Sequence, residues 1–202
     1  MAKTALKPVR RGRPPSEAAE SHAAILDAVY ELLQKGSVRD LTLEAVAKQA
    51  KVGRPTLYKW WPSKSALVLA MFHERIDRND AIPGTGTAEE VIRGKVHRLV
   101  RELNGLFGKV LADLIAEGQS EPAILQDLYE QHIKSRRAAT AADVERGKAA
   151  GEFAADIDTG LLMDSIFSPI FLRLLLRHPP LTERYGDEVI DQVLRGARPR
   201  AV

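Results

Sequence analysis

The sequence contains no cysteine. The chain therefore has no disulfide framework, no thiol nucleophile and no thiolate metal site, and a reducing compartment imposes no penalty on it. The simplest expectation from this absence is a cytoplasmic protein.

An apolar run long enough to cross a bilayer is also missing. The longest candidate, residues 157–178, is interrupted by Asp158, Asp164, Arg173 and Arg177, whereas a transmembrane helix needs about 20 predominantly apolar residues. The basic N-terminus is not followed by the apolar segment of a signal peptide. We therefore expect neither a membrane span nor a secretory leader.

Common enzyme motifs are missing too. His73 and Glu74 are not followed by the second histidine of H-E-x-x-H, there is no G-x-S-x-G or Walker sequence, and residues 84–86 lack the third glycine of a dinucleotide-binding loop. Asp156 and Asp158 resemble a D-x-D metal pair, but Asp favours helix N-caps and no partner ligand is near in sequence. We expect a protein that is not an enzyme and has no cofactor and no metal.

The chain has 202 residues, of which 28% are charged, with basic and acidic residues nearly balanced. Such a composition is not typical of a disordered chain. Because a domain takes roughly 100 to 200 residues, we expect one compact body or two small ones with a substantial core.

The net charge of +3 is unevenly distributed. Residues 1–78 contain 14 Lys and Arg against 8 Asp and Glu, a net +6, whereas residues 79–202 contain 16 against 19, a net −3. The first 16 residues hold five basic and no acidic residues. This pattern indicates a basic arm for a polyanion, with a solubilising tail as the alternative.

Apolar residues recur at helical spacing along nearly the whole chain. In the first helix, Ile25, Leu26, Val29 and Leu33 form a core-facing stripe before Gly36 ends it. The pattern predicts an all-α protein of about nine helices. We expect them near residues 17–36, 43–50, 55–60, 63–78, 92–103, 107–116, 122–136, 161–176 and 183–194.

Two short helices in the basic half, separated by residues 51–54, have the layout of a helix-turn-helix. We expect Gly53 to use its conformational freedom in the turn. The second helix has about six residues and is therefore roughly 9 Å long, so it fits a B-DNA major groove about 12 Å wide. We expect Leu57 to face the core, and the outer face to present Arg54, Thr56, Tyr58, Lys59 and Trp60.

These side chains suit contacts with DNA. Arg54 or Lys59 would specify a guanine, while Lys64 would reach a backbone phosphate and the Thr42 cap region would offer amide donors. The alternative from periodicity alone is an aromatic-rich piece of a small helical core. Upstream, residues 11–14 (Arg-Gly-Arg-Pro) resemble a minor-groove arm, because a narrow A·T-rich groove attracts inserted arginine.

The segments Leu41–Ala47 and Ala50–Leu67 resemble the DNA-binding domain of the TetR (tetracycline repressor) family, over about residues 20–70. The resemblance implies an all-helical homodimer, in which three N-terminal helices and a connecting fourth precede a ligand-binding body. Its last two helices would form a four-helix dimer interface. Members typically repress transcription from a palindromic operator and release it when a small molecule enters the C-terminal domain.

The resemblance also implies roles for particular positions. The family's phosphate contacts fall on Thr42, Tyr58 and Lys64, and Trp60 stands where many members have histidine. The recognition positions fall on Arg54, Pro55, Thr56, Tyr58, Lys59 and Trp60. With the arm residues Arg11 and Arg13, these make up the expected DNA-binding set.

The expected domains are a flexible basic arm at residues 1–16, a helix-turn-helix domain with its connecting helix at 17–80, and a ligand-binding and dimerisation domain at 88–202. Apolar faces of the middle helices suggest a ligand site. Its expected lining is Phe107, Leu111, Leu114, Tyr129, His132, Arg136, Met163, Phe167 and Phe171. The expected dimer interface is Ile170, Leu174, Leu175, Ile190, Val193 and Leu194.

The sequence thus predicts a DNA-binding regulator whose partners are operator DNA, a second copy of the chain and a small molecule, without a membrane. Two alternatives stay open. One keeps DNA binding in an activator or a ligand-independent regulator. The other is a helical small-molecule enzyme or carrier whose basic terminus is incidental.

Overall fold

The computed structural model describes residues 15–76 and 86–199. Over these residues the chain forms ten α-helices and one short π-helical segment, and it contains no β-strand. The expected all-α class is therefore confirmed. Arg11 and Arg13 of the predicted arm lie outside the described residues.

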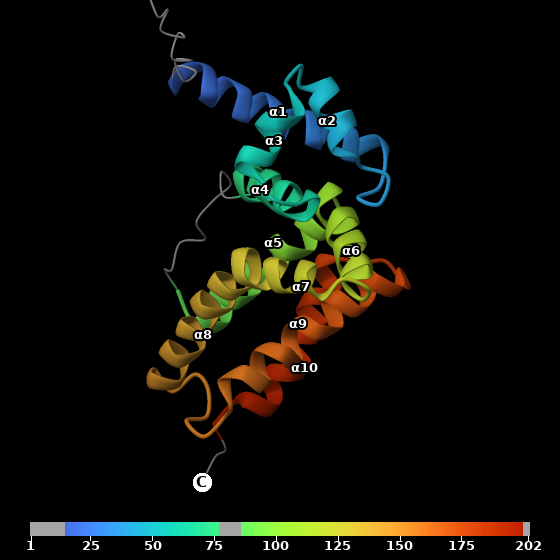
Figure 1. Cartoon of the computed structure of the whole chain (residues 1–202). Coiled ribbons are helices and arrows are strands. Elements are labelled where there is room, and N and C mark those ends of the chain that lie inside the picture. The colour runs from blue at the N-terminus through green and yellow to red at the C-terminus, as the bar shows by residue number, and fades with distance from the viewer. Residues whose placement is uncertain (1–14, 77–85, 200–202) are drawn as a thin grey trace, which may run out of the picture.

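The first four helices gather at one end of the molecule, and we call this group the head (Figure 1). They are α1 (Pro15–Lys35), α2 (Leu43–Gln49), α3 (Arg54–Trp60) and α4 (Lys64–Ile76). Helix α1 packs against α2 and α4, and α2 packs against α3. Helix α2 is thus supported by α1, and α3 by α2.

The remaining helices form a larger group, which we call the body (Figure 1). They are α5 (Ala88–Leu103), α6 (Leu106–Gly118), α7 (Pro122–Leu128), the π-helical segment Tyr129–Ile133, α8 (Lys134–Ala149), α9 (Thr159–Leu176) and α10 (Glu183–Ala197). Helix α10 packs along α5 and α9. At Gly186 it approaches α5 so closely that a β-carbon would lie 2.8 Å from Val96 Cγ1, so a larger residue there would push the two helices apart.

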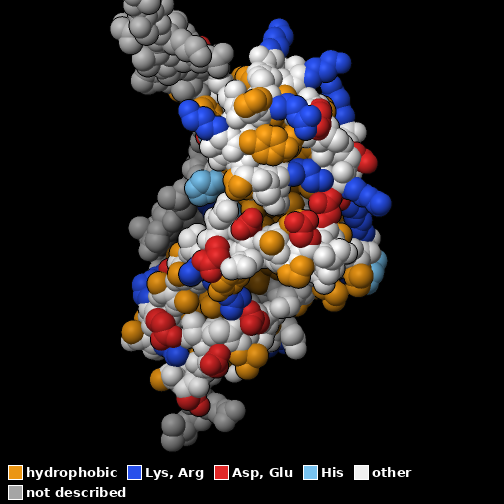
Figure 2. Space-filling view, viewed as in Figure 1, with side chains coloured by type: hydrophobic (Ala, Val, Ile, Leu, Met, Phe, Trp, Pro, Cys, Tyr) orange, Lys and Arg blue, Asp and Glu red, His pale blue; other side chains and the backbone are white. Residues whose placement is uncertain are grey.

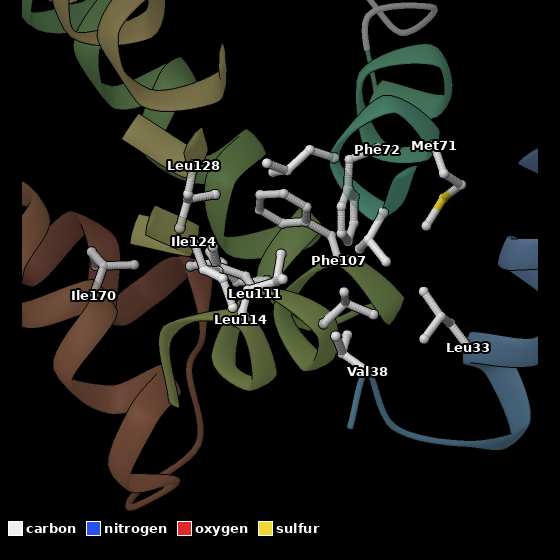
Figure 3. Close-up of a cluster of buried hydrophobic side chains, with 14 of the residues drawn as sticks. Leu33, Val38, Met71, Phe72, Phe107, Leu111, Leu114, Ile124, Leu128 and Ile170 are labelled. Atoms are coloured by element: carbon white, nitrogen blue, oxygen red, sulfur yellow. The ribbon is translucent and has the colours of Figure 1, made fainter. Parts of the chain in front are cut away.

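Head and body share one continuous apolar core. Figure 3 shows Phe72 of α4 facing Phe107 of α6, with Leu33 and Val38 of the head at one side and Ile170 of α9 at the other. The Phe72 and Phe107 side chains are 5% and 9% exposed. The two groups therefore interlock through buried rings of α4 and α6.

The helix expected near residues 122–136 is divided. Its middle is the π-helical segment, where the Lys134 N–H donates to the Tyr129 carbonyl five residues earlier. Beyond this segment α8 continues to Ala149, further than expected. Apolar periodicity does not predict a single widened turn, because one turn of π-helix shifts the side-chain phase without interrupting the helix.

Helix α9 is the one described helix long and apolar enough to cross a membrane by length and composition. Its inner face packs on α8 and α10 and includes Ile166 and Ile170, which are 1% and 0% exposed. Its outer face carries large apolar side chains that are exposed among the described residues. These are Leu161, Leu172, Leu175 and Leu176, which are 43 to 67% exposed.

Candidate functional site

The first helix of the helix-turn-helix begins at a surface N-cap. Thr42 is exposed, and its Oγ1 accepts a hydrogen bond of 3.1 Å from the Ala45 N–H. The cap satisfies one of the free amides at the start of α2. The remaining amides and the positive end of the helix dipole favour an anion at this point, as expected for a phosphate contact.

The turn between α2 and α3 differs from the expectation for Gly53. Gly53 has φ −76° and ψ 144°, an extended conformation that any residue adopts. The left-handed residue is Lys51, with φ 54°. The Val52 N–H donates to the Ala47 carbonyl, 3.0 Å away, and the Lys51 N–H donates to the Lys48 carbonyl, 3.2 Å away. These are the two bonds of a Schellman motif, which requires the left-handed conformation at the position that Lys51 occupies.

Helix α3 presents its outer face to solvent. Leu57 is 1% exposed and anchors the helix on the core. Tyr58 is 52% exposed, and Arg54 and Lys59 are exposed as well. In Figure 2 the Lys and Arg side chains gather over the head, whereas the body mixes both signs of charge. The predicted reading residues thus lie on one accessible helix within a basic surface.

Arg54 already has an acidic neighbour. Its Nη2 lies 2.5 Å from Glu44 Oε1, and both side chains are more than half exposed. An exposed ion pair of this kind contributes little to stability. It joins the first turn of α3 to α2 without fixing the guanidinium there, so Arg54 stays available to a base edge.

A cavity of about 350 Å³ lies in the body between α5, α6, α8 and α9. Its size is at the lower end of the range of roughly 300–1,000 Å³ that is typical of ligand pockets. Seven of the nine expected residues line it. They are Phe107, Leu111, His132, Arg136, Met163, Phe167 and Phe171.

The other two expected lining residues lie elsewhere. Leu114 is 0% exposed and packs in the core, whereas Tyr129 is 45% exposed at the surface. Both are on the helices that form the cavity, but neither lines it. The apolar faces identified the helices correctly, and the phase of each helix decided which side chains reach the cavity.

Helix α6 contacts the cavity with one face. Phe107, Leu111 and Ile115 line the cavity at intervals of four residues. The Phe107 ring also packs edge-on against Phe72 of α4, with centroids 5.0 Å apart. One side chain therefore contacts both the cavity and the helix that follows the recognition helix.

The opposite face of α6 holds the end of α1 by polar contacts. Lys109 Nζ donates to the carbonyls of Leu33 and Gly36, 3.2 and 2.7 Å away. Asp113 Oδ2 accepts from the Val38 N–H at 3.0 Å. Because these residues are two positions out of phase with the cavity-lining residues, they lie on the other side of the helix.

Lys64 lies at the same junction. Its Nζ donates to the Val38 carbonyl at 2.7 Å and lies 3.7 Å from Glu117 Oε1 of α6. Among the described residues, Glu117 Oε1 is buried without a hydrogen-bond partner. In this conformation the Lys64 side chain, which we expected to contact a phosphate, therefore contacts the loop before α2 and helix α6 of the body.

Two family models match the chain. Residues 25–71 match the bacterial regulatory proteins of the tetR family, and residues 82–193 match the tetracyclin repressor-like C-terminal domain. The chain belongs to the TetR family of transcriptional regulators. It is accordingly a DNA-binding transcriptional regulator with a helix-turn-helix.

Individual relatives agree with this assignment. The chain is 30% identical over 189 residues to the HTH-type transcriptional regulator YdeS of Bacillus subtilis (strain 168), covering 94% of each chain. The DNA-binding transcriptional repressor TetR of Mycobacteroides abscessus is 24% identical over 174 residues, 85% of this chain and 90% of that one.

Solved structures share the fold. The TetR family regulator SCO0332 superposes with a TM-score of 0.74 at 28% identity, over 89% of this chain and 100% of that one. FadR from Bacillus subtilis, solved with stearoyl-CoA, has a TM-score of 0.66 at 19% identity, over 88% and 100%. Because FadR is only 19% identical to this chain, its similarity shows a shared fold and nothing more.

Trp60 is where this TetR-family chain departs from the histidine of many members. It is half-buried, and its ring centroid lies 4.8 Å from that of His22 in α1 and 5.6 Å from that of Trp61. The side chain therefore packs against α1, and only part of it reaches the outer surface of α3. The sequence pattern gave no sign of the contact with His22.

The expected dimer-interface residues divide into two groups. Ile170, Ile190 and Leu194 are 0 to 1% exposed within the chain, so they pack in its own core and have no surface for a partner. Leu175 is 43% exposed, and Leu174 and Val193 are partly buried. Helical spacing identified the apolar helices but not which of their faces the chain itself covers.

The basic part of the cavity lining was also missed, apart from His132 and Arg136. Lys95, Arg98 and Arg137 line the cavity, although each looks like an ordinary surface position in the sequence. His97, beside them on α5, turns away and places Nε2 2.7 Å from Asp187 Oδ1 of α10. The sequence does not show which of these basic side chains points to the cavity and which points to α10.

Proposed function

We propose that this chain is a repressor that binds a palindromic operator as a homodimer and releases it when a small molecule occupies the body cavity. The observation that carries the proposal is the double contact of α6, which lines the cavity with one face and holds the head with the other. An activator with the same sites is the alternative.

The proposed DNA contacts start from the exposed face of α3. Arg54 and Lys59 reach base edges, Tyr58 and the α2 N-terminus at Thr42 contact phosphates, and Lys64 joins them by leaving the Val38 carbonyl. A major-groove helix needs this combination of cations, hydroxyls and free amides. Arg11 and Arg13 would add minor-groove contacts.

The proposed dimer uses the outer face of α9. Three of its four exposed leucines, Leu172, Leu175 and Leu176, form an apolar surface at the C-terminal end of the helix, which runs along the side of the body (Figure 1). Grouped exposed apolar side chains of this kind mark interaction sites. A two-fold axis beside α9 makes the contact self-complementary and gives the two α3 helices the symmetry of a palindrome.

The proposed release is a shift between two conformations of α6. A ligand that fits the cavity better when α6 is displaced favours the displaced state by its difference in affinity for the two states. Displacement of α6 moves Lys109 and Asp113, which hold the end of α1, and Phe107, which packs on α4. The head then turns, and the two α3 helices lose the spacing of about 34–36 Å between successive major grooves.

The domain division belongs to the same proposal. Residues 17–80 would be the DNA-binding domain and residues 88–202 the ligand-binding and dimerisation domain, with the chain acting in the cytoplasm, where its operator DNA is. The arrangement into head and body supports this division.

Binding to the DNA upstream of the chain's own gene and of neighbouring genes tests the proposal. We expect the full-length protein to bind one short fragment of this DNA, at moderate salt, at least a thousandfold more tightly than random DNA, a ratio typical of specific regulators. Footprinting should show two symmetric half-sites, and light scattering should give a dimer. Equal affinity of the folded protein for every fragment would contradict the operator. A reporter gene in a deletion strain distinguishes a repressor from an activator.

A further inference from the structure

Glu117 is an unfavourably placed acid at the junction of head and body. Its side chain is 24% exposed, and its Oε1 atom is buried without a hydrogen-bond partner among the described residues. Glu117 also lies in the last turn of α6, where the negative end of the helix dipole disfavours a carboxylate. Because a buried charge without compensation costs free energy, this position needs a nearby cation.

Lys64 of the head is that cation. Its Nζ lies 3.7 Å from Glu117 Oε1, which is too long for a hydrogen bond but within the range of an ion pair. Over residues 15–76 and 86–199, this is the only ion pair of Glu117. Removing one partner of a partly buried pair leaves the other charge uncompensated, which costs more than the pair itself contributes. Glu117 therefore depends on the position of Lys64.

The other contacts of Lys64 also direct it away from the surface. Its Nζ donates to the Val38 carbonyl at 2.7 Å and to the Arg39 carbonyl at 3.4 Å, both in the loop between α1 and α2. Lys64 is the first residue of α4, four residues after the end of the recognition helix α3. Its side chain is 30% exposed, so it is accessible from solvent. A DNA phosphate would have to draw the ammonium group away from these acceptors.

Glu117 belongs to the helix that lines the cavity. Ile115, two residues earlier, lines the cavity itself. Asp113, four residues earlier and therefore on the same face as Glu117, accepts from the Val38 N–H. A displacement of α6 consequently moves the Glu117 carboxylate relative to Lys64, which belongs to the head.

We propose that Glu117 competes with the DNA phosphates for Lys64 and thereby weakens DNA binding. This inference rests on the proposed phosphate contact of Lys64 and adds the regulation of that contact. When Lys64 moves to a phosphate, Glu117 loses its compensating cation, and the cost of this loss reduces the free energy of DNA binding. Because α6 carries Glu117, the position of α6 sets the strength of the competition.

A double-mutant cycle on DNA binding tests the competition. The wild type, Glu117→Gln, Lys64→Ala and the double variant are titrated by fluorescence anisotropy with one short duplex of random sequence at moderate salt. We expect Glu117→Gln to tighten binding about three- to tenfold in the wild type and by less than about 1.5-fold in Lys64→Ala, as for directly coupled residues. Because phosphate contacts carry no sequence information, the gain should be the same on the operator.

Glu121→Gln is the matched control. Glu121 is exposed and lies four residues beyond Glu117, and its side chain does not cap α7. Its substitution removes the same charge without touching Lys64. Since the loss of any acid favours binding to a polyanion, the difference between Glu117→Gln and Glu121→Gln measures the competition.

Unfolding in urea measures the same dependence without DNA. Lys64→Ala should lower the urea midpoint more in the wild type than in Glu117→Gln, because only the wild type then contains an uncompensated carboxylate. Equal shifts in the two backgrounds would overturn the inference. Circular dichroism checks that each variant is folded, and Lys64→Met, which keeps the aliphatic part of the side chain, replaces Lys64→Ala if the latter does not fold.

Three results on random DNA would also overturn the inference. They are unchanged or weaker binding by Glu117→Gln, the same gain in the Lys64→Ala background, or an equal gain in Glu121→Gln. Unchanged affinity of Lys64→Ala would overturn it together with the proposed phosphate contact. Operator binding is measured separately, so a folded protein that shows the expected cycle on random DNA but prefers no operator contradicts the proposed repressor and not this inference.

Discussion

The ring of Phe107 lies 5.0 Å from the ring of Phe72, edge to face at 85°. Phe107 lines the cavity, and Phe72 belongs to α4, the helix that follows the recognition helix. The cavity and the DNA-binding head are therefore separated by one aromatic contact. Both rings are nearly buried, so movement of one requires the other to repack.

This contact predicts energetic coupling between the two residues. Phe72→Leu and Phe107→Leu should each lower the free energy of unfolding, and the double variant should lose less than the sum of the two. We expect a coupling energy of about 0.5–1.5 kcal/mol, the usual range for an aromatic pair. Urea unfolding of the four proteins measures it. Losses that add within about 0.3 kcal/mol would show that the rings are independent.

Arg54 is expected to carry sequence specificity. Arg54→Ala should weaken operator binding by about 1–3 kcal/mol, as for loss of a bidentate contact to guanine, with a smaller effect on random DNA. Glu44→Gln removes the ion-pair partner of Arg54 and should leave operator affinity unchanged or higher. Fluorescence anisotropy with both DNAs separates these effects. If Arg54→Ala weakened both DNAs by the same factor, Arg54 would contact only the backbone.

The sequence predicts those parts of the site in which single residues indicate the local structure. The head is predicted closely, because Thr42 and Pro55 are specific signals for helix starts and Leu57 is the single inward residue of α3. The turn is not, because glycine is the usual left-handed residue but Lys51 occupies that position here. The two backbone bonds of the Schellman motif fix the left-handed conformation at the second residue after α2, whichever residue is there.

The body shows the limit of periodicity more clearly. The segment 161–176 has apolar residues on more than one side, so its sequence does not distinguish Ile170, which is buried in the chain, from Leu172, which is 55% exposed. The basic residues in the cavity lining are hidden for the opposite reason. Arg98 looks like a solvated residue in the sequence, and only the fold places it in the lining of the cavity.

The exposed leucines of α9 predict the effect of a charge there. Leu172→Glu should weaken self-association at least about thirtyfold, because a two-fold interface contains the substituted residue twice and a buried unpaired charge is costly. Light scattering over a dilution series measures the change. Tyr129→Glu is the control, since Tyr129 is a large exposed side chain on the π-helical segment. Equal weakening by both substitutions would place the interface elsewhere.

The polar contact of α6 with the head predicts a local change in dynamics. The Val38 N–H donates to Asp113 Oδ2 at 3.0 Å, a bond to a charged acceptor worth about 1.5–3 kcal/mol. Asp113→Ala should therefore accelerate exchange of the Val38 amide hydrogen roughly tenfold or more. The Ala45 amide, which donates to Thr42, is the internal control. Unchanged exchange at Val38, measured by NMR, would mean that Asp113 does not hold this loop.

The seam between α5 and α10 predicts a dependence of stability on pH. Burial raises the pKa of Asp187, whereas hydrogen bonds from Arg93 and His97 lower it. The lowering is the larger effect, so the pKa of Asp187 is below its ordinary value. An acid with a depressed pKa stabilises the fold above its unfolded pKa, and this contribution is lost as the pH falls through the folded value. The contribution of Asp187 should therefore be complete at neutral pH and disappear below about pH 4.

Asp187→Asn makes this contribution measurable. At pH 7 the variant should be less stable by only about 1 kcal/mol, because Asp187 is partly exposed and exposed ion pairs are weak, and because Arg93 keeps Glu89 and Asp191 as partners. The difference in unfolding free energy should shrink as the pH is lowered from 5 to 3. Glu188→Gln, on the same helix with Arg184 as its partner, controls for loss of an exposed acid. A difference that stays constant over this range would mean that the carboxylate charge of Asp187 contributes nothing, and that its hydrogen bonds act in either protonation state.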